Sequence, residues 1–227
     1  MAQVPSAERG QLIDQVVAVV SPPRASGLAI GPSETVITLS DLRFEAAVVF
    51  IQRGRPEAAL RTLDQEALSS ALEYAISQRL HDQEAEKLRV FSAQPAELDT
   101  AVQELEAQLG GPQALDRFLS RQERTRAELR RVLERSLRAA RTLDSRIRLR
   151  AQVSDSEVRR YYDRTLEQAR GQLADALPSS FEEVRGSIRE KLFRERYTAL
   201  ARTETAQLRE QADVRILSSL APEGEGR

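Results

Sequence analysis

The chain has 227 residues, with 34 lysines plus arginines, 35 acidic residues, a single histidine and no cysteine or tryptophan. The lack of cysteine excludes disulfides, thiol nucleophiles and zinc–thiolate sites, and the lone histidine, His81, cannot build a histidine metal cage. The formal net charge of -1 argues against binding nucleic acid through overall charge, and no run of about 18 apolar residues could span a membrane. We therefore expect no catalytic, metal or cofactor site and no membrane span.

The charges are distributed in two blocks of opposite sign. Residues 56–116 carry 12 acidic and 4 cationic side chains, a net charge of -8, whereas residues 117–150 carry 12 arginines and 4 acidic side chains, a net charge of +8. Blocks of this kind can pair with each other in the fold or attract a partner. The sequence leaves both interpretations open.

The first predicted elements are two strands. Residues 1–11 are polar and contain no apolar segment, so we expect no secretory signal peptide within the chain. The sequence LIDQVVAVV from Leu12 is rich in β-branched residues, and Val36-Ile37-Thr38 resumes this character after a loop rich in proline and glycine. Together they predict a two-stranded hairpin with a long loop over residues 21–35.

After Thr38 the apolar spacing changes from 2 to about 3.6 residues, which predicts helices. The first helix should begin at the N-cap Thr38 and end near Arg53. The second should begin near Leu63, with Thr62 and Gln65 as a capping box. We expect His81 of this helix to be a partly exposed surface residue, since no second ligand or catalytic partner accompanies it.

Three further helices are marked by their ends. Pro95 and Glu97 begin a helix that Gly110-Gly111 stops, and Pro112 opens a short one. Thr125 and Glu128 form a capping box for a long helix with apolar residues on one flank. Its other flank is cationic, with Arg130, Arg131, Arg135, Arg138, Arg141 and Arg146. This arginine stripe is either a solvated face or a phosphate-binding surface, and the lack of aromatic residues in it weakens the second interpretation.

The last part of the chain contains two helices and a strand. Ser154 and Glu157 cap a helix that includes Tyr161-Tyr162, residues 167–180 read as loosely structured, and Ser180 with Glu183 caps a last long helix. β character returns at residues 213–217, and we expect this strand to pair with residues 16–20.

These elements predict a mainly α fold. We expect a cradle of about six to seven helices with a small β-sheet, formed by the N-terminal hairpin and the C-terminal strand. The predicted organisation is one domain over residues 12–217, in which residues 12–166 pack against residues 181–217, with flexible tails at 1–11 and 218–227. Exposed strand edges and long terminal helices would allow a domain-swapped homodimer.

The order of the segments resembles a known family. VVAVV, VITLSDL, LRAQVSDSEVRRYY and the FEEV-to-ADVRIL ending follow one another as in the chaperone module of SurA-type periplasmic folding factors, the SurA/PrsA/PpiD group, over residues 12–217. In that family a parvulin prolyl isomerase domain usually follows the helix that contains the two tyrosines. Here the stretch between Tyr162 and Phe181 is too short for a domain, so the resemblance implies a parvulin-less protein that is not an enzyme.

The resemblance implies an ATP-independent, periplasmic chaperone that holds unfolded outer-membrane or secreted polypeptides, without cofactor and without nucleic acid. A holdase needs a concave apolar surface with a polar rim. The candidate peptide-binding residues are Phe44, Phe50, Leu115, Phe118, Leu119 and Tyr162. The alternative function is a non-catalytic helical adaptor or assembly subunit that binds one specific protein partner.

Overall fold

The computed structural model describes residues 14–22, 34–89, 92–170 and 180–217. Its elements follow the predicted order, and the mainly helical fold with a small antiparallel sheet is confirmed. The elements are β1 (Val16–Ser21), β2 (Thr35–Thr38), α1 (Leu39–Gln52), the 3₁₀ turn η1 (Ala58–Leu60), α2 (Gln65–Leu88), α3 (Pro95–Leu109), α4 (Pro112–Arg121), α5 (Arg126–Ile147), α6 (Asp155–Arg170), α7 (Phe181–Gln211) and β3 (Asp213–Ile216). Of the predicted loop over residues 21–35, Ser21 and Thr35 belong to β1 and β2, and residues 23–33 lie outside the described residues, as do the predicted tails. The prediction of loose structure over residues 167–180 was wrong for residues 167–170, which continue α6, and residues 171–179 lie outside the described residues.

The sheet joins the two ends of the described chain. Its strand order is β2-β1-β3, with β1 antiparallel to both neighbours. Val20 lies opposite Thr35 on one side and Val214 on the other, which confirms the predicted pairing of the terminal strands. One face of the sheet packs on α2, where Leu72 and Ile76 are buried beside the strand residues.

Most predicted helix ends are confirmed by their capping hydrogen bonds. The Thr38 side chain accepts from the Asp41 N–H, and capping boxes join Gln94 to Glu97, Thr125 to Glu128 and Ser180 to Glu183. The predicted start of α2 was wrong by two residues. The carboxylate of Asp64 accepts from the N–H of Ala67 at 2.8 Å, so Asp64, and not Thr62, is the N-cap.

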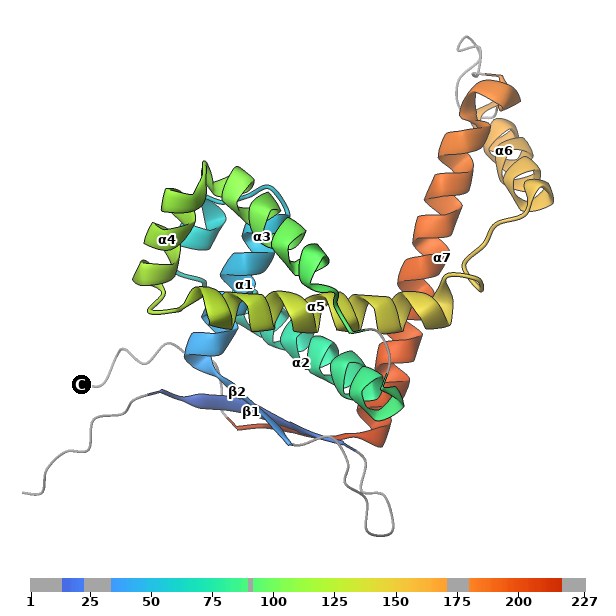
Figure 1. Ribbon diagram of the computed structural model, residues 1–227. Helices are drawn as coiled ribbons and strands as arrows, with labels where there is room; N and C mark the ends of the chain where they lie inside the picture. The colour runs from blue at the N-terminus through green and yellow to red at the C-terminus, as the bar shows by residue number, and fades with distance from the viewer. Residues whose placement is uncertain (1–13, 23–33, 90–91, 171–179, 218–227) are drawn as a thin grey trace, which may run out of the picture.

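Two apolar clusters form the body of the molecule. The first lies between α1, α3, α4 and the start of α5, and the second lies between the sheet, α2 and the end of α7. We call α3 and α4 the lobe. In Figure 1 α5 runs across the molecule, above α2 and below the lobe, and its C-terminal end lies beside α7.

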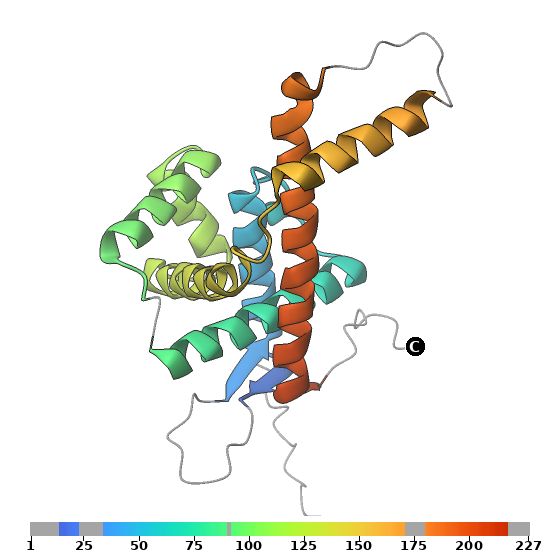
Figure 2. The same cartoon turned by 90° about the vertical axis from the view of Figure 1, so that its right-hand side faces the viewer.

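The last long helix extends well beyond the body. Its C-terminal half packs on α2 and α5, whereas its N-terminal half packs on α6 (Figure 2). We call α6 together with residues 181–196 the arm. Val158 of α6 and Ile188 of α7 are buried in the arm. Within the described residues, no helix has the length and apolar character needed to cross a membrane.

Candidate functional site

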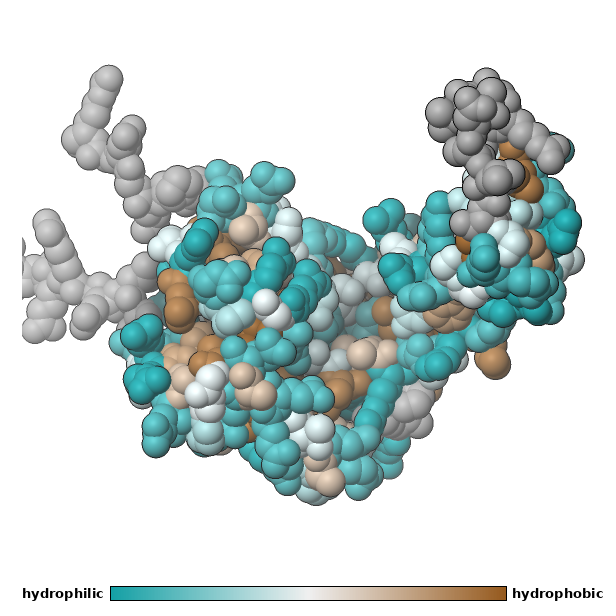
Figure 3. All heavy atoms as spheres, turned by 90° about the horizontal axis from the view of Figure 1, so that it is seen from above, coloured by the Kyte–Doolittle hydropathy of each residue, from teal (hydrophilic) through white to brown (hydrophobic). Residues whose placement is uncertain are grey.

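The candidate site is the hollow between the lobe and the arm, with α5 beneath it. Figure 3 looks down into this hollow and shows apolar side chains at its bottom and hydrophilic ones around it. The hollow exists because α7 stands beside one end of α5 while the lobe covers the other end (Figure 1). A depression of this kind can receive an extended segment of polypeptide, which a closed pocket cannot.

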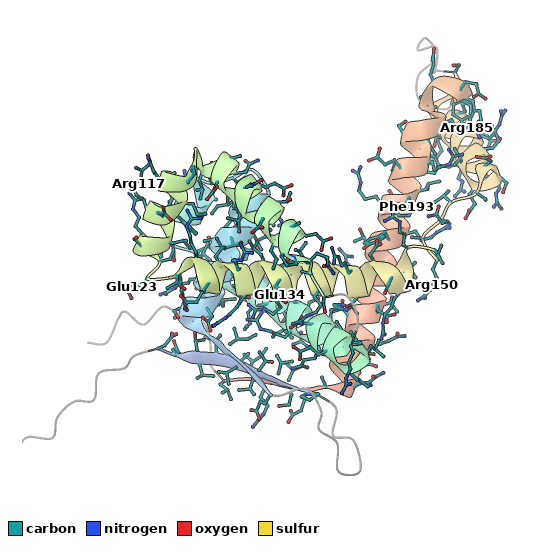
Figure 4. All side chains as sticks on the ribbon, viewed as in Figure 1. Arg117, Glu123, Glu134, Arg150, Arg185 and Phe193 are labelled. Atoms are coloured by element: carbon teal, nitrogen blue, oxygen red, sulfur yellow. The ribbon has the colours of Figure 1, made fainter. Side chains whose placement is uncertain are left out.

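Two aromatic residues of α7 form one wall. The rings of Phe193 and Tyr197 are 5.8 Å apart, and both side chains are half-buried. The Tyr197 hydroxyl donates to Asp144 Oδ1 of α5 at 3.3 Å, and burial together with the charge of Asp144 raises the pKa of Tyr197. Phe193 lies one turn above Tyr197 on the same helix face, past the contact with α5 (Figure 4). This aromatic pair therefore presents an apolar surface beside the floor.

The floor is the stripe of α5 from Leu137 through Ala140 to Asp144. These positions are three or four residues apart and so share one helix face. Arg141, on the same face, pairs with Glu97 of α3, while Asp144 contacts Tyr197 of α7. The stripe consequently lies between the lobe and the arm, with Leu137 half-buried and Ala140 exposed.

One arginine links the two helices of the arm to the segment between α5 and α6. Arg196 of α7 donates to the carbonyl oxygen of Gln152, in the segment between α5 and α6, at 2.5 Å and also pairs with Glu157 at the start of α6. The hydrogen bonds from Arg196 and from Ser154 lower the pKa of Glu157 to about 2. The carboxylate therefore stays charged over the neutral pH range, and it caps α6 while it holds α6 against α7.

The predicted peptide-binding residues do not gather in the hollow. Phe44, Leu115, Phe118 and Leu119 are 0–3% exposed in the cluster between α1, α3, α4 and α5. For these four residues the prediction of an open binding surface needs correction, because they are core. The Phe118 ring of α4 stacks on the Phe44 ring of α1, with centroids 6.2 Å apart, in a cluster that side chains of α3 and α5 complete.

The other two predicted residues lie at separate places. Phe50 is half-buried beside η1, and Tyr162 makes an edge-on contact with Phe181 on the arm, with ring centroids 5.4 Å apart. Phe193 and Tyr197 are not among the binding residues predicted from the sequence. Their i, i+4 spacing places both on one face of the helix. Only the position of α7 in the fold shows that this face is not packed in the core where α7 rises above α5.

The arginine stripe of α5 is an intramolecular interface. Arg138 donates two hydrogen bonds to Asp82 of α2, at 2.5 and 3.1 Å, and Arg146 reaches Glu84 at 2.5 Å. Arg135 pairs with Glu45 of α1, which Arg79 of α2 also contacts. The acidic and basic blocks thus face each other, and these three arginines of α5 pair with carboxylates within the fold and are partly shielded from solvent.

His81 is buried, contrary to the predicted surface position. Its side chain is 2% exposed, and Nε2 is hydrogen-bonded to the Thr205 hydroxyl of α7 at 2.9 Å. Burial lowers the pKa of His81. The prediction failed because α7, more than 120 positions later in the chain, covers this face of α2.

Neither a metal-binding cluster nor a similar known protein identifies the function of the chain. No group of three His, Asp or Glu side chains in the described part of the chain could hold a metal ion. No family model matches the chain, and no curated protein matches its sequence. The resemblance to SurA-type chaperones therefore stays a prediction.

Proposed function

We propose that this protein is an ATP-independent chaperone that holds unfolded polypeptides in the hollow between the lobe and the arm. The observation that carries the proposal is an open depression with the apolar side chains of Leu137 and Ala140 on its floor and a partly exposed aromatic pair on its wall. Such a surface shields apolar segments of varied sequence, because it makes few directional contacts.

The walls of the hollow can keep their positions while a client is bound. The lobe side rests on one apolar cluster and the base of α7 on the other, and the ion pairs between α2 and α5 join the two. A client would therefore meet a preformed surface, which reduces the ordering entropy lost on binding.

We further propose that the protein has no prolyl isomerase activity and acts in the periplasm. Both points rest on the resemblance to SurA-type chaperones. Only residues 171–180 separate α6 from α7, too few for a parvulin domain. An isomerase assay on a proline peptide should stay at the uncatalysed rate. A clear acceleration would contradict this part of the proposal.

The test is suppression of aggregation. A urea-unfolded β-barrel membrane protein is diluted into buffer with excess chaperone, and light scattering is followed with time. We expect suppression by the natural chain and weaker suppression by Phe193→Ser. Tyr74→Ser, which removes an aromatic side chain that is 40% exposed on α2, is the matched control and should act as the natural chain does.

The results also separate the two candidate functions. Suppression for several unrelated clients supports the chaperone. Lack of suppression for every client, together with capture of one folded protein that Phe193→Ser releases, would instead favour the adaptor. Equal losses for Phe193→Ser and Tyr74→Ser would remove the hollow as the site.

A further inference from the structure

A second concave surface lies away from the hollow. It is a groove of about 290 Å³ between α1, η1 and residues 61–63, and none of its lining residues comes from α5, α6 or α7. Its apolar lining consists of Ala47, Phe50, Ala58, Ala59, Leu60 and Leu63, of which Leu60 is 54% exposed, and Thr62 and Gln122 complete the lining beside two arginines. The volume is at the lower end of the range for ligand sites and suits a single anchoring side chain.

The end of α1 shapes the rim of this groove. Gly54 adopts φ +70°, its N–H donates to Ile51 O at 2.9 Å, and the N–H of Arg55 donates to Phe50 O at 3.0 Å. This double hydrogen bond is the Schellman termination of a helix, which requires a left-handed residue at Gly54. It turns the chain back so that the Arg55 guanidinium lies 5.1 Å from the centre of the Phe50 ring.

The rim is cationic and its charges are not satisfied within the described fold. Arg43 and Arg61 line the groove and, like Arg55, are exposed and form no ion pair with another described residue. This differs from α5, where most arginines pair with carboxylates of α1, α2 and α3. Residues 43–63 contain two glutamates, and one of them, Glu45, already pairs with Arg79 and Arg135. Glu57 is therefore the one remaining carboxylate in this segment, which carries several arginines.

We propose that this groove binds an acidic peptide segment through one aliphatic side chain. The aliphatic group would enter between Leu60 and Leu63, and flanking carboxylates would pair with Arg43 and Arg61. Arginine is suited to this task because its planar guanidinium binds carboxylates through two hydrogen bonds.

The lining favours a peptide over a nucleic acid. A nucleic acid has phosphates for the arginines but no aliphatic side chain for the apolar floor. It would also need an open aromatic face for base stacking, and one face of the Phe50 ring is covered by Arg55. The groove would give the protein a binding surface for an acidic partner in addition to the client surface proposed for the hollow.

The test uses a fluorescein-labelled peptide with one leucine between two pairs of glutamates, in a fluorescence anisotropy titration. We expect binding that weakens as salt is added, and a loss of about tenfold or more in affinity for the double variant Arg43→Glu, Arg61→Glu. The peptide with glycine in place of leucine should bind at least about fivefold more weakly, because the groove then buries no side chain.

The matched control is Arg131→Glu, Arg202→Glu. It reverses two other exposed arginines that form no ion pair with a described residue, and it should bind the peptide as the natural chain does. Circular dichroism melts establish that both double variants fold. Equal affinity losses in the two double variants, or no preference for leucine, would overturn the proposal, as would tighter groove-dependent binding of a single-stranded oligonucleotide.

This proposal can fail separately from the chaperone function. If the groove variant suppresses aggregation normally and the natural chain does not bind the acidic peptide, only the groove assignment is lost. If the peptide binds as expected but aggregation proceeds unchecked, the groove stands and the hollow does not.

Discussion

Phe118 illustrates how strongly the role of one residue depends on what covers it. As a phenylalanine on a short amphipathic helix it could equally face a client or a core. In the fold its ring stacks on Phe44, and both side chains are 2% exposed. Phe193, in contrast, remains half-buried at the edge of the hollow. The two phenylalanines should therefore respond differently to truncation.

Phe118→Ala should lower the free energy of unfolding by ~3–5 kcal/mol, because it leaves a cavity in the first apolar cluster. Phe193→Ala should cost below about 1 kcal/mol, since little of its contact area lies in a core. Urea unfolding followed by circular dichroism measures both. A stability for Phe118→Ala within error of the natural chain would show that its ring is not core.

His81 makes folding sensitive to pH. Burial disfavours its charged form and lowers its pKa below the unfolded value, so the neutral ring is the form that the fold prefers. Glu84 of its own helix and Glu204 of α7 act in the opposite direction, and Arg146 of α5 acts with burial. The stabilisation is thus present above the unfolded pKa of about 6.5 and is lost as the pH falls through that value toward the folded pKa.

We expect the urea midpoint of the natural chain to fall between about pH 7.5 and about pH 5.5, the interval in which an unfolded histidine gains its proton. His81→Gln should lose most of this pH dependence, because His81 is the single histidine of the chain. Midpoints measured at several pH values for both proteins decide the matter. A natural chain with a flat profile over this interval would contradict the assignment.

At the scale of elements, α2 and α5 are held together by charge as well as by apolar contacts. The Arg138–Asp82 pair has two hydrogen bonds and is largely shielded, with side-chain exposures of 21% and 12%. Arg131 of the same helix is exposed and forms no ion pair with a described residue. The helix therefore carries Arg138, which is paired and shielded, and Arg131, which is exposed, within two turns of each other, so the two can be compared directly.

Arg138→Met should destabilise the fold by ~2 kcal/mol, since it leaves the Asp82 carboxylate shielded and without its partner. Methionine keeps much of the apolar stem, so the loss reports mainly on the charge. Arg131→Met is the control and should change stability by less than about 0.5 kcal/mol. Thermal or urea unfolding of the two variants measures the difference, and equal effects would refute a structural role for the ion pair.

At the scale of the whole molecule, the short sheet closes the chain on itself. β3 adds to β1 at the side opposite β2, and Val214 packs against the second apolar cluster while α7 rests on α2. The C-terminal end of α7, from which the arm extends, is thereby fixed by residues from both ends of the described chain. The position of the hollow depends on this closure.

A chain that ends at Gln211 should lose ~2–4 kcal/mol of stability, at about 1 kcal/mol for each ladder hydrogen bond together with the burial of Val214. It should also tend to associate, because the edge of β1 is exposed. A chain that ends at Leu217 is the control. Thermal unfolding and sedimentation compare the two, and an unchanged midpoint with a monomeric product would argue against the closure.

The sequence alone determined the kinds of element and most of their ends, because caps and apolar periodicity are local. Thr38, the Thr125–Glu128 box and the β-branched runs at both ends each act over a few residues. The start of α2 was mispredicted, because Asp64 is the cap in place of Thr62, and so was the end of α6, which continues to Arg170. Fold class followed from the sum of these signals.

The tertiary structure alone decided what each surface faces. The sequence showed two charge blocks, and only the packing of α2 on α5 showed that they neutralise each other. The sequence also contained His81 and several phenylalanines that could be exposed or buried. Only the positions of α7 and α4 determined that His81, Phe44 and Phe118 are covered. Burial is a property of contacts between residues distant in sequence, so local patterns cannot supply it, and the hollow became visible only once the helices were placed.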